Sequence, residues 1–271
     1  MPDIKSEVFA LLKQVSASLI LPRYQNLQSN EITTKTSATD FVTIADREAE
    51  QWLTPRLQAV FDCSVVGEEA CADDPAIYQQ AQTGMAWTVD PIDGTSNFVK
   101  GRERFCTMIA LTKDGLPQQA WIYQQLTDTL FYAAAGEGSW RVTDAGEERV
   151  FVSPTADDLD DMIGSGNTLG VAEPLKSDIQ ARLKTLKGRR FTGSAGVQGT
   201  LIAAGAEDYM LHGNCTPWDH APVDLLCREA GGHSAMVTDG ARYRAGHAGP
   251  YMVAASQQIW NDLEARIWRG R

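Results

Sequence analysis

The fold and the chemistry of this chain centre on the stretch Met85-Ala86-Trp87-Thr88-Val89-Asp90-Pro91-Ile92-Asp93-Gly94-Thr95-Ser96-Asn97. Its first five residues are mostly apolar and predict a buried strand that ends at Asp90. Pro91 fixes φ and has no N–H, which suits a tight turn that brings the two aspartates to one point. Carboxylates and backbone carbonyls, here the carbonyl of Ile92, are the oxygen ligands that Mg²⁺ prefers. The segment from Gly94 onward predicts a helix start, whose exposed N–H groups can receive a phosphate.

A second acidic pair lies upstream of this stretch. Cys63-Ser64-Val65-Val66-Gly67 predicts a short buried strand, and Glu68 and Glu69 follow it directly. Each acidic segment by itself is typical of a solvated loop or of a turn with a helix cap. Together, at the ends of two strands, they favour a site for divalent cations. Haloacid-dehalogenase-like phosphatases use Asp-x-Asp-Gly-Thr, but two residues separate Asp90 from Asp93 here, so that motif matches poorly.

The rest of the chain predicts stacked layers of helix and sheet. Helices are expected over 4–21 and 43–60, although Pro55 should disturb the second one. Strands then follow in quick succession: 105–112, 117–123, 129–135, 138–142 and 149–152. Beyond them, strands (162–166, 208–211, 234–238, 251–255) alternate with helices (175–186, 195–206, 218–230, 256–268). This order predicts an α+β half over 1–152 and an α/β half over 153–271, joined in one compact unit with the site at the junction.

The composition is that of an ordinary globular protein, with 43% apolar and 22% charged residues among 271. We expect a cytoplasmic protein without a membrane partner, because the sequence shows no leader peptide and no long apolar run, and its five cysteines are scattered. The formal net charge of −11 argues against direct nucleic-acid binding. A chain this acidic would also repel a phosphorylated substrate, unless bound divalent cations reversed the local charge.

Three parts of the sequence share one further pattern: Asp40–Glu50 with Val66–Glu69, Trp87–Phe98, and Gly193–Ala195 with Trp218-Asp219 and Glu229–Gly232. In order and spacing they resemble the inositol monophosphatase family of the lithium-sensitive, Mg²⁺-dependent sugar-phosphatase superfamily, from about Lys35 to Gly232. The resemblance implies a layered αβαβα fold. It also implies a metal-assisted attack of water on the phosphorus of a small phosphorylated metabolite.

Position by position, the resemblance implies a site with two to three Mg²⁺ ions that lithium inhibits. The implied metal ligands are Glu68, Asp90, the Ile92 carbonyl, Asp93 and Asp219. The implied catalytic residues are Glu69, acting through a metal-bound water, Thr95, orienting the attacking water, and Asp46, holding the Thr95 hydroxyl. The implied substrate contacts are Asp93, Gly94, Thr95, Ser194, Ala195 and Asp219. From the residues alone, a helix cap is the simpler interpretation of Asp219, because it begins an apolar helix.

The expected substrate wall departs from the family pattern. Where inositol phosphatases carry a glutamate before Trp-Asp, this chain has His212, which would bind a hydroxyl differently. A surface histidine before a glycine turn is the competing interpretation. Lys35 occupies the place of a basic residue that the family carries near the metal-bound water.

These patterns predict Mg²⁺-dependent hydrolysis of a small polyol or sugar phosphate, with inositol 1-phosphate as the default substrate. Histidinol phosphate, fructose 1,6-bisphosphate and 3′-phosphoadenosine 5′-phosphate are alternatives within the same superfamily, and His212 weakens the inositol assignment in particular. A regulatory protein-binding factor with secondary catalysis is an alternative of another class, since some bacterial members resemble accessory factors of RNA-associated machinery. The resemblance also implies a homodimer.

Overall fold

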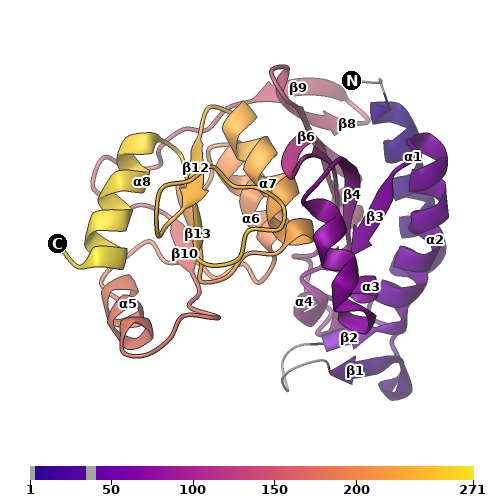
Figure 1. The fold of residues 1–271 in the computed structure, drawn as a ribbon, viewed down its shortest axis with the longest axis horizontal. Helices are drawn as coiled ribbons and strands as arrows, with labels where there is room; N and C mark the ends of the chain where they lie inside the picture. Colours follow the sequence, from indigo (N-terminus) through magenta and orange to yellow (C-terminus); the bar gives the residue numbers. More distant parts are fainter. Residues whose placement is uncertain (1–3, 35–40) are drawn as a thin grey trace.

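The computed structural model describes residues 4–34 and 41–271, which form five alternating layers of helix and sheet (Figure 1). The three helical layers are α1 (Lys5–Val15) with α2 (Ile44–Val60), α6 (Ala195–Ala203) with α7 (Pro217–Glu229), and α5 (Leu175–Leu183) with α8 (Gln257–Leu263). Between them lie a seven-stranded and a four-stranded sheet. The predicted αβαβα layering is therefore confirmed.

The seven-stranded sheet contains, in spatial order, β3 (Ser64–Gly67), β4 (Met85–Asp93), β5 (Cys106–Lys113), β6 (Leu116–Gln124), β7 (Thr129–Ala134), β8 (Gly138–Thr143) and β9 (Gly146–Val150). The first pair is parallel, with Val66 opposite Thr88, and all later pairs are antiparallel. Side chains of α1 and α2 pack on one face of this sheet against the fully buried Trp87 and Trp121. Burial of such large apolar groups supplies much of the driving force for folding.

The four-stranded sheet has the order β10 (Gly164–Gly166), β11 (Tyr209–His212), β13 (Tyr251–Ala254) and β12 (His233–Met236). Helix α7 packs against strands of both sheets, and its apolar side chains share one core with them. The change from one sheet to the other falls between Val150 and Gly164. Helix α7 joins the two sheets into one core, and the division into halves at residue 153 stays a prediction.

Short elements complete the chain. The hairpin of β1 (Ile32–Thr34) and β2 (Phe41–Thr43) precedes α2, while α3 (Glu68–Asp73) and α4 (Thr95–Val99) follow β3 and β4. Tighter or wider helical turns cover Ser16–Ile20, Leu21–Arg23, Ser29–Glu31, Pro75–Ala81, Gln125–Thr127 and Glu264–Arg269. In the described ranges, no helix has the length and apolar character that a bilayer crossing requires.

Several expected boundaries are wrong, one of them at the centre of the site. β4 does not end at Asp90 in a tight turn, but continues to Asp93. Asp90 pairs with Met108 and Asp93 pairs with Cys106, so β4 contains one extra residue at this point. Such a bulge accommodates Pro91, which has no N–H for the ladder, and it allows two aspartates three residues apart to face the same side.

The other boundary errors are smaller. The first helix is regular only to Val15, well before Pro22, and continues as wider and tighter turns. Pro55 lies inside a helix that is continuous from Ile44 to Val60. The expected strand over 162–166 forms only at Gly164–Gly166, and the acids after β3 begin a helix that the sequence pattern did not predict.

Candidate active site

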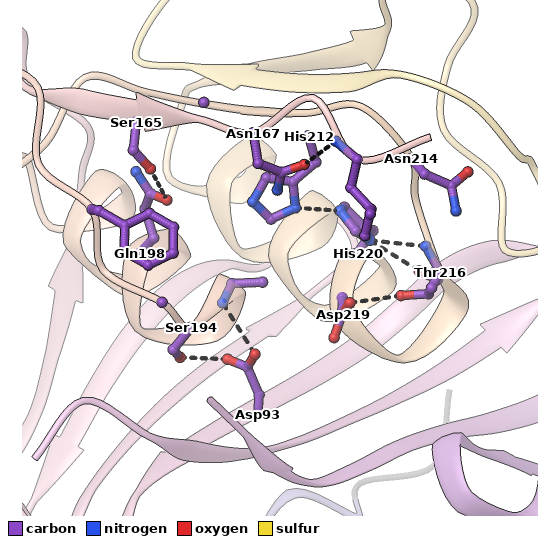
Figure 2. Close-up of a pocket in the computed structure, with 15 residues that line it drawn as sticks. Asp93, Ser165, Asn167, Ser194, Gln198, His212, Asn214, Thr216, Asp219 and His220 are labelled. Atoms are coloured by element: carbon purple, nitrogen blue, oxygen red, sulfur yellow. Dashed lines mark hydrogen bonds between the residues drawn. The ribbon is translucent and has the colours of Figure 1, made fainter. Parts of the chain in front are cut away.

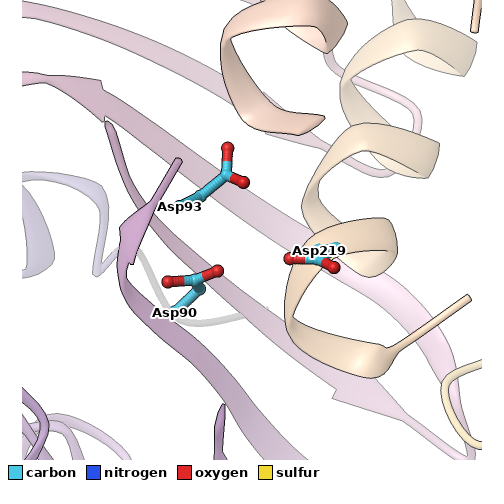
Figure 3. A group of neighbouring side chains, drawn as sticks. All are labelled: Asp90, Asp93 and Asp219. Atoms are coloured by element: carbon cyan, nitrogen blue, oxygen red, sulfur yellow. The ribbon is translucent and has the colours of Figure 1, made fainter. Parts of the chain in front are cut away.

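Three aspartates from distant parts of the chain form a compact carboxylate cluster (Figure 3). Asp90 and Asp93 come from the bulged end of β4, and Asp219 comes from the first turn of α7. Each offers one oxygen within 4.8 Å of the other two. The predicted metal ligands of the two halves therefore meet, and Asp219 is more than a cap because its carboxylate faces the other two.

The electrostatics of this cluster favour a cation. Burial raises the pKa of Asp90 well above its usual range, and the neighbouring charge of Glu68 raises it further. Burial, followed by repulsion from Asp93, raises the pKa of Asp219 to about 7. A hard divalent cation takes oxygen ligands and offsets their mutual repulsion, so this donor set fits Mg²⁺.

Glu68 lies outside the compact cluster but close enough to act on it. Its charge contributes to the raised pKa values of Asp90, Asp219 and Asp46. It occupies the first turn of α3, directly after β3. Its neighbour Glu69 is buried on the same turn. The predicted metal ligand Glu68 thus lies beside the cluster, and the charge of Glu69 acts on the neighbouring Asp46.

Glu50, which the sequence reasoning missed, holds this turn in place. Its buried carboxylate, from α2, accepts the N–H of Glu69 at 2.9 Å and the N–H of Ala70 at 2.8 Å. A Cβ built on Gly67 would lie 2.5 Å from Oε2 of Glu50, so a side chain at this position would displace the Glu50 carboxylate. The glycine just before the acidic pair was the signal that another group approaches the backbone at that point.

Thr95 and Asp46 are in contact as predicted. The Thr95 hydroxyl lies 3.3 Å from Oδ1 of Asp46 and 2.9 Å from the carbonyl oxygen of Ile92. Oδ2 of Asp46 accepts both the N–H and the hydroxyl of Thr43, at 2.8 and 2.5 Å, and so caps α2. Burial raises the pKa of Asp46 to about 7. Gly94 starts α4 with a φ of 88°, a conformation that favours glycine.

Asp93 is bound by the N-terminus of α6. The hydroxyl of Ser194 donates to it (Figure 2). The N–H groups of Ala195 and Gly196 also donate to it, at 3.1 and 2.7 Å. The two predicted substrate residues Ser194 and Ala195 therefore also position a predicted metal ligand. These donors oppose the effect of burial, which still raises the pKa of Asp93.

Asn97 is a second supporting residue that the sequence reasoning missed. Its side-chain amide donates to the carbonyl oxygens of Arg104 at 2.7 Å, Thr192 at 3.0 Å and Gly193 at 3.2 Å. These bonds tie the segment before α6 to the segment after β4. No sequence pattern identifies such a residue, because its partners are backbone carbonyls.

A cavity of about 260 Å³ opens beside the cluster (Figure 2). Its lining includes Asp93, Asp219, Ser194, Ala195 and His212. The predicted metal and substrate residues thus share one cavity. Lys35 lies outside the described residues.

His212 is not an isolated surface histidine, because it is paired with His220 on α7. Nδ1 of His212 lies 2.9 Å from Nε2 of His220, and the N–H of Thr216 donates to Nδ1 of His220 at 3.0 Å. Nδ1 of His220 also lies 3.1 Å from the carbonyl oxygen of Thr216, so either ring can be the donor in the bond between the two histidines. Burial lowers the pKa of His212 to about 4 and also lowers the pKa of His220 well below its usual value, so both rings are neutral near pH 7.

Comparison with known proteins places this chain in a family. The sequence model of the inositol monophosphatase family matches residues 5–268. The chain belongs to this family. Inositol-1-monophosphatase from Bacillus subtilis is 30% identical to it over 210 residues, which cover 76% of each chain. The Nus factor SuhB of Vibrio cholerae is 31% identical over 218 residues, which cover 76% of this chain and 74% of that protein.

The solved structures agree with this inositol monophosphatase-family assignment. The extragenic suppressor protein suhB from Bartonella henselae is 26% identical, with a TM-score of 0.80 over 100% of both chains. The predicted family is confirmed, and so is the fold that the resemblance implied. The roles of the individual site residues stay predictions.

Proposed function

We propose that this protein is a Mg²⁺-dependent phosphoric monoester hydrolase that acts on a small polyol or sugar phosphate. The observation that carries the proposal is the cluster of Asp90, Asp93 and Asp219 beside a cavity that two of them line. Membership of the inositol monophosphatase family supports the phosphatase activity. The relative from Bacillus subtilis supports inositol 1-phosphate as the first substrate to test.

Bound Mg²⁺, two to three ions in this proposal, neutralises charge on the phosphate and makes water a stronger nucleophile. The residues that would hold it are Glu68, Asp90, the carbonyl of Ile92, Asp93 and Asp219. Thr95 orients the attacking water with a hydroxyl that Asp46 and the Ile92 carbonyl fix at 3.3 and 2.9 Å. Glu69, buried on the first turn of α3, accepts a proton from that water. The phosphate oxygens lie against the amides of Gly94 and Thr95.

The alcohol portion of the substrate occupies the cavity of about 260 Å³. Ser194 and Ala195 line its side nearest Asp93, and His212 lines it together with Asp219. A neutral imidazole at His212 has one N–H and one acceptor nitrogen, whereas a carboxylate offers only acceptors. The substrate can therefore differ from inositol 1-phosphate, and histidinol phosphate, fructose 1,6-bisphosphate and 3′-phosphoadenosine 5′-phosphate belong in the same test.

The test is a panel of these phosphate esters, assayed for phosphate release with Mg²⁺, with a chelator, and with lithium added. Asp93→Asn should lower kcat/KM by ~100-fold or more, since changes to groups that only support a metal ligand already cost about 10–100-fold. Asp157→Asn, at an exposed position outside the cavity, is the matched control and should leave the rate unchanged. Turnover retained by Asp93→Asn, or by wild type in excess chelator, would contradict the metal-site assignment.

A second function is favoured by one observation, the 31% identity to a protein named as a Nus factor. In this alternative the chain is a regulatory protein-binding factor with secondary catalysis, and the net charge of −11 disfavours direct RNA contact. An Asp90→Asn variant that fully replaces the wild type in cells would support it. Cells that respond to Asp90→Asn as they do to deletion of the gene would contradict it.

We further propose that the protein is a homodimer in the cytoplasm. None of the five cysteines forms a disulfide, which supports a reducing compartment. Light scattering that gives the mass of a single chain at working concentrations would contradict the dimer.

A further inference from the structure

A further donor reaches Asp93 from the neighbouring strand of the large sheet. Cys106 begins β5 and is the ladder partner of Asp93 at the bulge of β4, which brings the two side chains together. Its Sγ lies 3.4 Å from Oδ2 of Asp93 and 3.7 Å from the hydroxyl oxygen of Ser194. Within residues 4–34 and 41–271 the thiol has no other hydrogen-bond partner, and the side chain is fully buried.

The two oxygens of the Asp93 carboxylate accept unequal numbers of hydrogen bonds. Oδ2 accepts from the hydroxyl of Ser194, from the N–H of Gly196 at 2.7 Å and from the thiol of Cys106. In the described part of the chain, Oδ1 accepts a single bond, from the N–H of Ala195 at 3.1 Å. A carboxylate oxygen has about two lone pairs, so Oδ2 is fully used and Oδ1 keeps one for a cation.

The glycine at position 196 allows the sulfur to approach this oxygen. A Cβ built on Gly196 would lie 2.5 Å from Sγ of Cys106, 2.6 Å from Sδ of Met108 and 3.1 Å from Oδ2 of Asp93. The first turn of α6 and the two sulfur atoms thus pack closely around the carboxylate. A thiol suits this place, because it fills apolar volume in the core that α6 and α7 share with the large sheet and still has an S–H to donate.

We propose that Cys106 is a positioning residue, whose S–H holds Oδ2 of Asp93 and so leaves Oδ1 for the cation. Cys106 does not touch the substrate or the cation, because it belongs neither to the lining of the cavity nor to the compact carboxylate cluster. It acts on metal affinity through Asp93. The inference rests on the proposed function, because it requires Asp93 to be a metal ligand.

The competing interpretation is that Cys106 only fills space, as a buried cysteine often does. Cys227 provides the comparison, since it is fully buried in the same core. Its Sγ lies 3.5 Å from the carbonyl oxygen of Gly199, a neutral acceptor, whereas the thiol of Cys106 faces a carboxylate. Hydrogen bonds to an ionised acceptor are the stronger kind, so loss of the donor should matter at Cys106 and not at Cys227.

The experiment separates the donor from the volume with three variants. Cys106→Val fills the space without a donor, Cys106→Ser keeps a donor in less space, and Cys227→Val is the matched control. Calorimetric titration uses Mn²⁺, which takes the same oxygen ligands as Mg²⁺. Cys106→Val should bind Mn²⁺ about 10-fold more weakly than wild type, the lower end of the cost of removing a partner of a metal ligand. Cys106→Ser and Cys227→Val should bind it as wild type does, and the Mg²⁺ concentration at half-maximal rate should follow the same order.

Infrared spectroscopy of the folded protein in chelator tests the bond without a metal and without Cys106→Val. The S–H stretching band of each thiol is identified from the difference between wild type and the corresponding serine variant. The band of Cys106 should lie at lower frequency than that of Cys227, because the carboxylate is the stronger acceptor, and Asp93→Asn should shift it upward. A Cys106 band at the frequency of a free thiol would overturn the inference.

The outcomes also separate this inference from the proposed function. If Asp93→Asn binds Mn²⁺ as tightly as wild type, the proposed metal site fails and the inference fails with it. If Asp93→Asn loses affinity while Cys106→Val equals Cys227→Val, Cys106 only fills space and the inference alone is overturned. Equal losses in Cys106→Ser and Cys106→Val would overturn it too, because the donor would then not be what matters.

Discussion

The contact between Gly67 and Glu50 gives the sharpest prediction. A methyl group at position 67 would lie 2.5 Å from Oε2 of Glu50, well inside any real contact, so Gly67→Ala must push the carboxylate away. The Glu50 carboxylate holds the N–H groups of Glu69 and Ala70 at 2.9 and 2.8 Å. The first turn of α3 then loses its anchor, and Glu68 and Glu69 move with it.

The size of the effect follows from these two bonds. A hydrogen bond to a charged group contributes about 1.5–3 kcal/mol, so the loss of both costs about 3–6 kcal/mol before relaxation. Burial raises the pKa of Glu50 to about 7, so the carboxylate is itself costly to bury and the net loss is smaller, at most about 3 kcal/mol. A shift of the catalytic turn by about 1 Å lowers kcat roughly 100-fold.

The assay measures urea unfolding, kcat, KM and the Mg²⁺ concentration at half-maximal rate. Glu50→Gln keeps the shape but only one acceptor oxygen, so it should show the same changes at smaller size. Glu48→Gln, on the same helix but paired with Arg23 at 2.7 Å, is the matched control. If Glu50→Gln equals Glu48→Gln in both stability and kcat, then Glu50 does not position α3 and the reasoning is refuted. A rise in KM at unchanged kcat, in Gly67→Ala or in Glu50→Gln, would also refute the reasoning.

Three further predictions concern the pocket, the junction and a buried acid. His212→Glu should raise kcat/KM for inositol 1-phosphate relative to ribose 5-phosphate by ~10-fold, because a carboxylate accepts from several hydroxyls; an unchanged ratio would exclude His212 from the substrate wall. Asn97→Ala, which removes three hydrogen bonds, should lower the free energy of unfolding by about 1–3 kcal/mol and raise KM by displacing Gly193. Burial raises the pKa of Asp224 to about 6, so the unfolded state loses this proton first as pH rises. Between pH 4 and 7 the wild type should therefore lose up to about 3 kcal/mol relative to Asp224→Asn, and parallel urea curves across that range would contradict it.

The sequence predicted the layers better than the bulge at their centre. Apolar periodicity located nearly every helix and strand, because each buries one face against a neighbouring layer. It could not show that β4 continues past Asp90, because proline normally ends a strand and the bulge forms only against Met108 and Cys106 of β5. The short helix α3 was also missed, since its six residues show no helical repeat.

The candidate site was predicted in its acids but not in their supports. Asp90 and Asp93 were identified because acids after an apolar segment are visible in a sequence. Asp219 was identified only through the family resemblance, since from the residues alone a helix cap was the simpler interpretation. Glu50 and Asn97 were missed because their partners are backbone groups. Every residue has a backbone carbonyl and nearly every residue has an N–H, so the sequence does not show which of them a side chain will bind. The pairing of His212 with His220 was missed for another reason, since it depends on how β11 lies against α7.

The two helix starts that support the site do so in opposite ways. At α3 a carboxylate holds the helix, because Glu50 accepts the first N–H groups of α3, and this helix carries Glu68 and Glu69. At α6 the helix is the support, because its amides and Ser194 bind Asp93 itself. Loss of Glu50 should therefore displace predicted ligands without changing the cavity. Loss of the Ser194 hydroxyl should disturb both the predicted ligand Asp93 and the cavity, because Ser194 lines the cavity as well. For Ser194→Ala, kcat and KM should therefore change together.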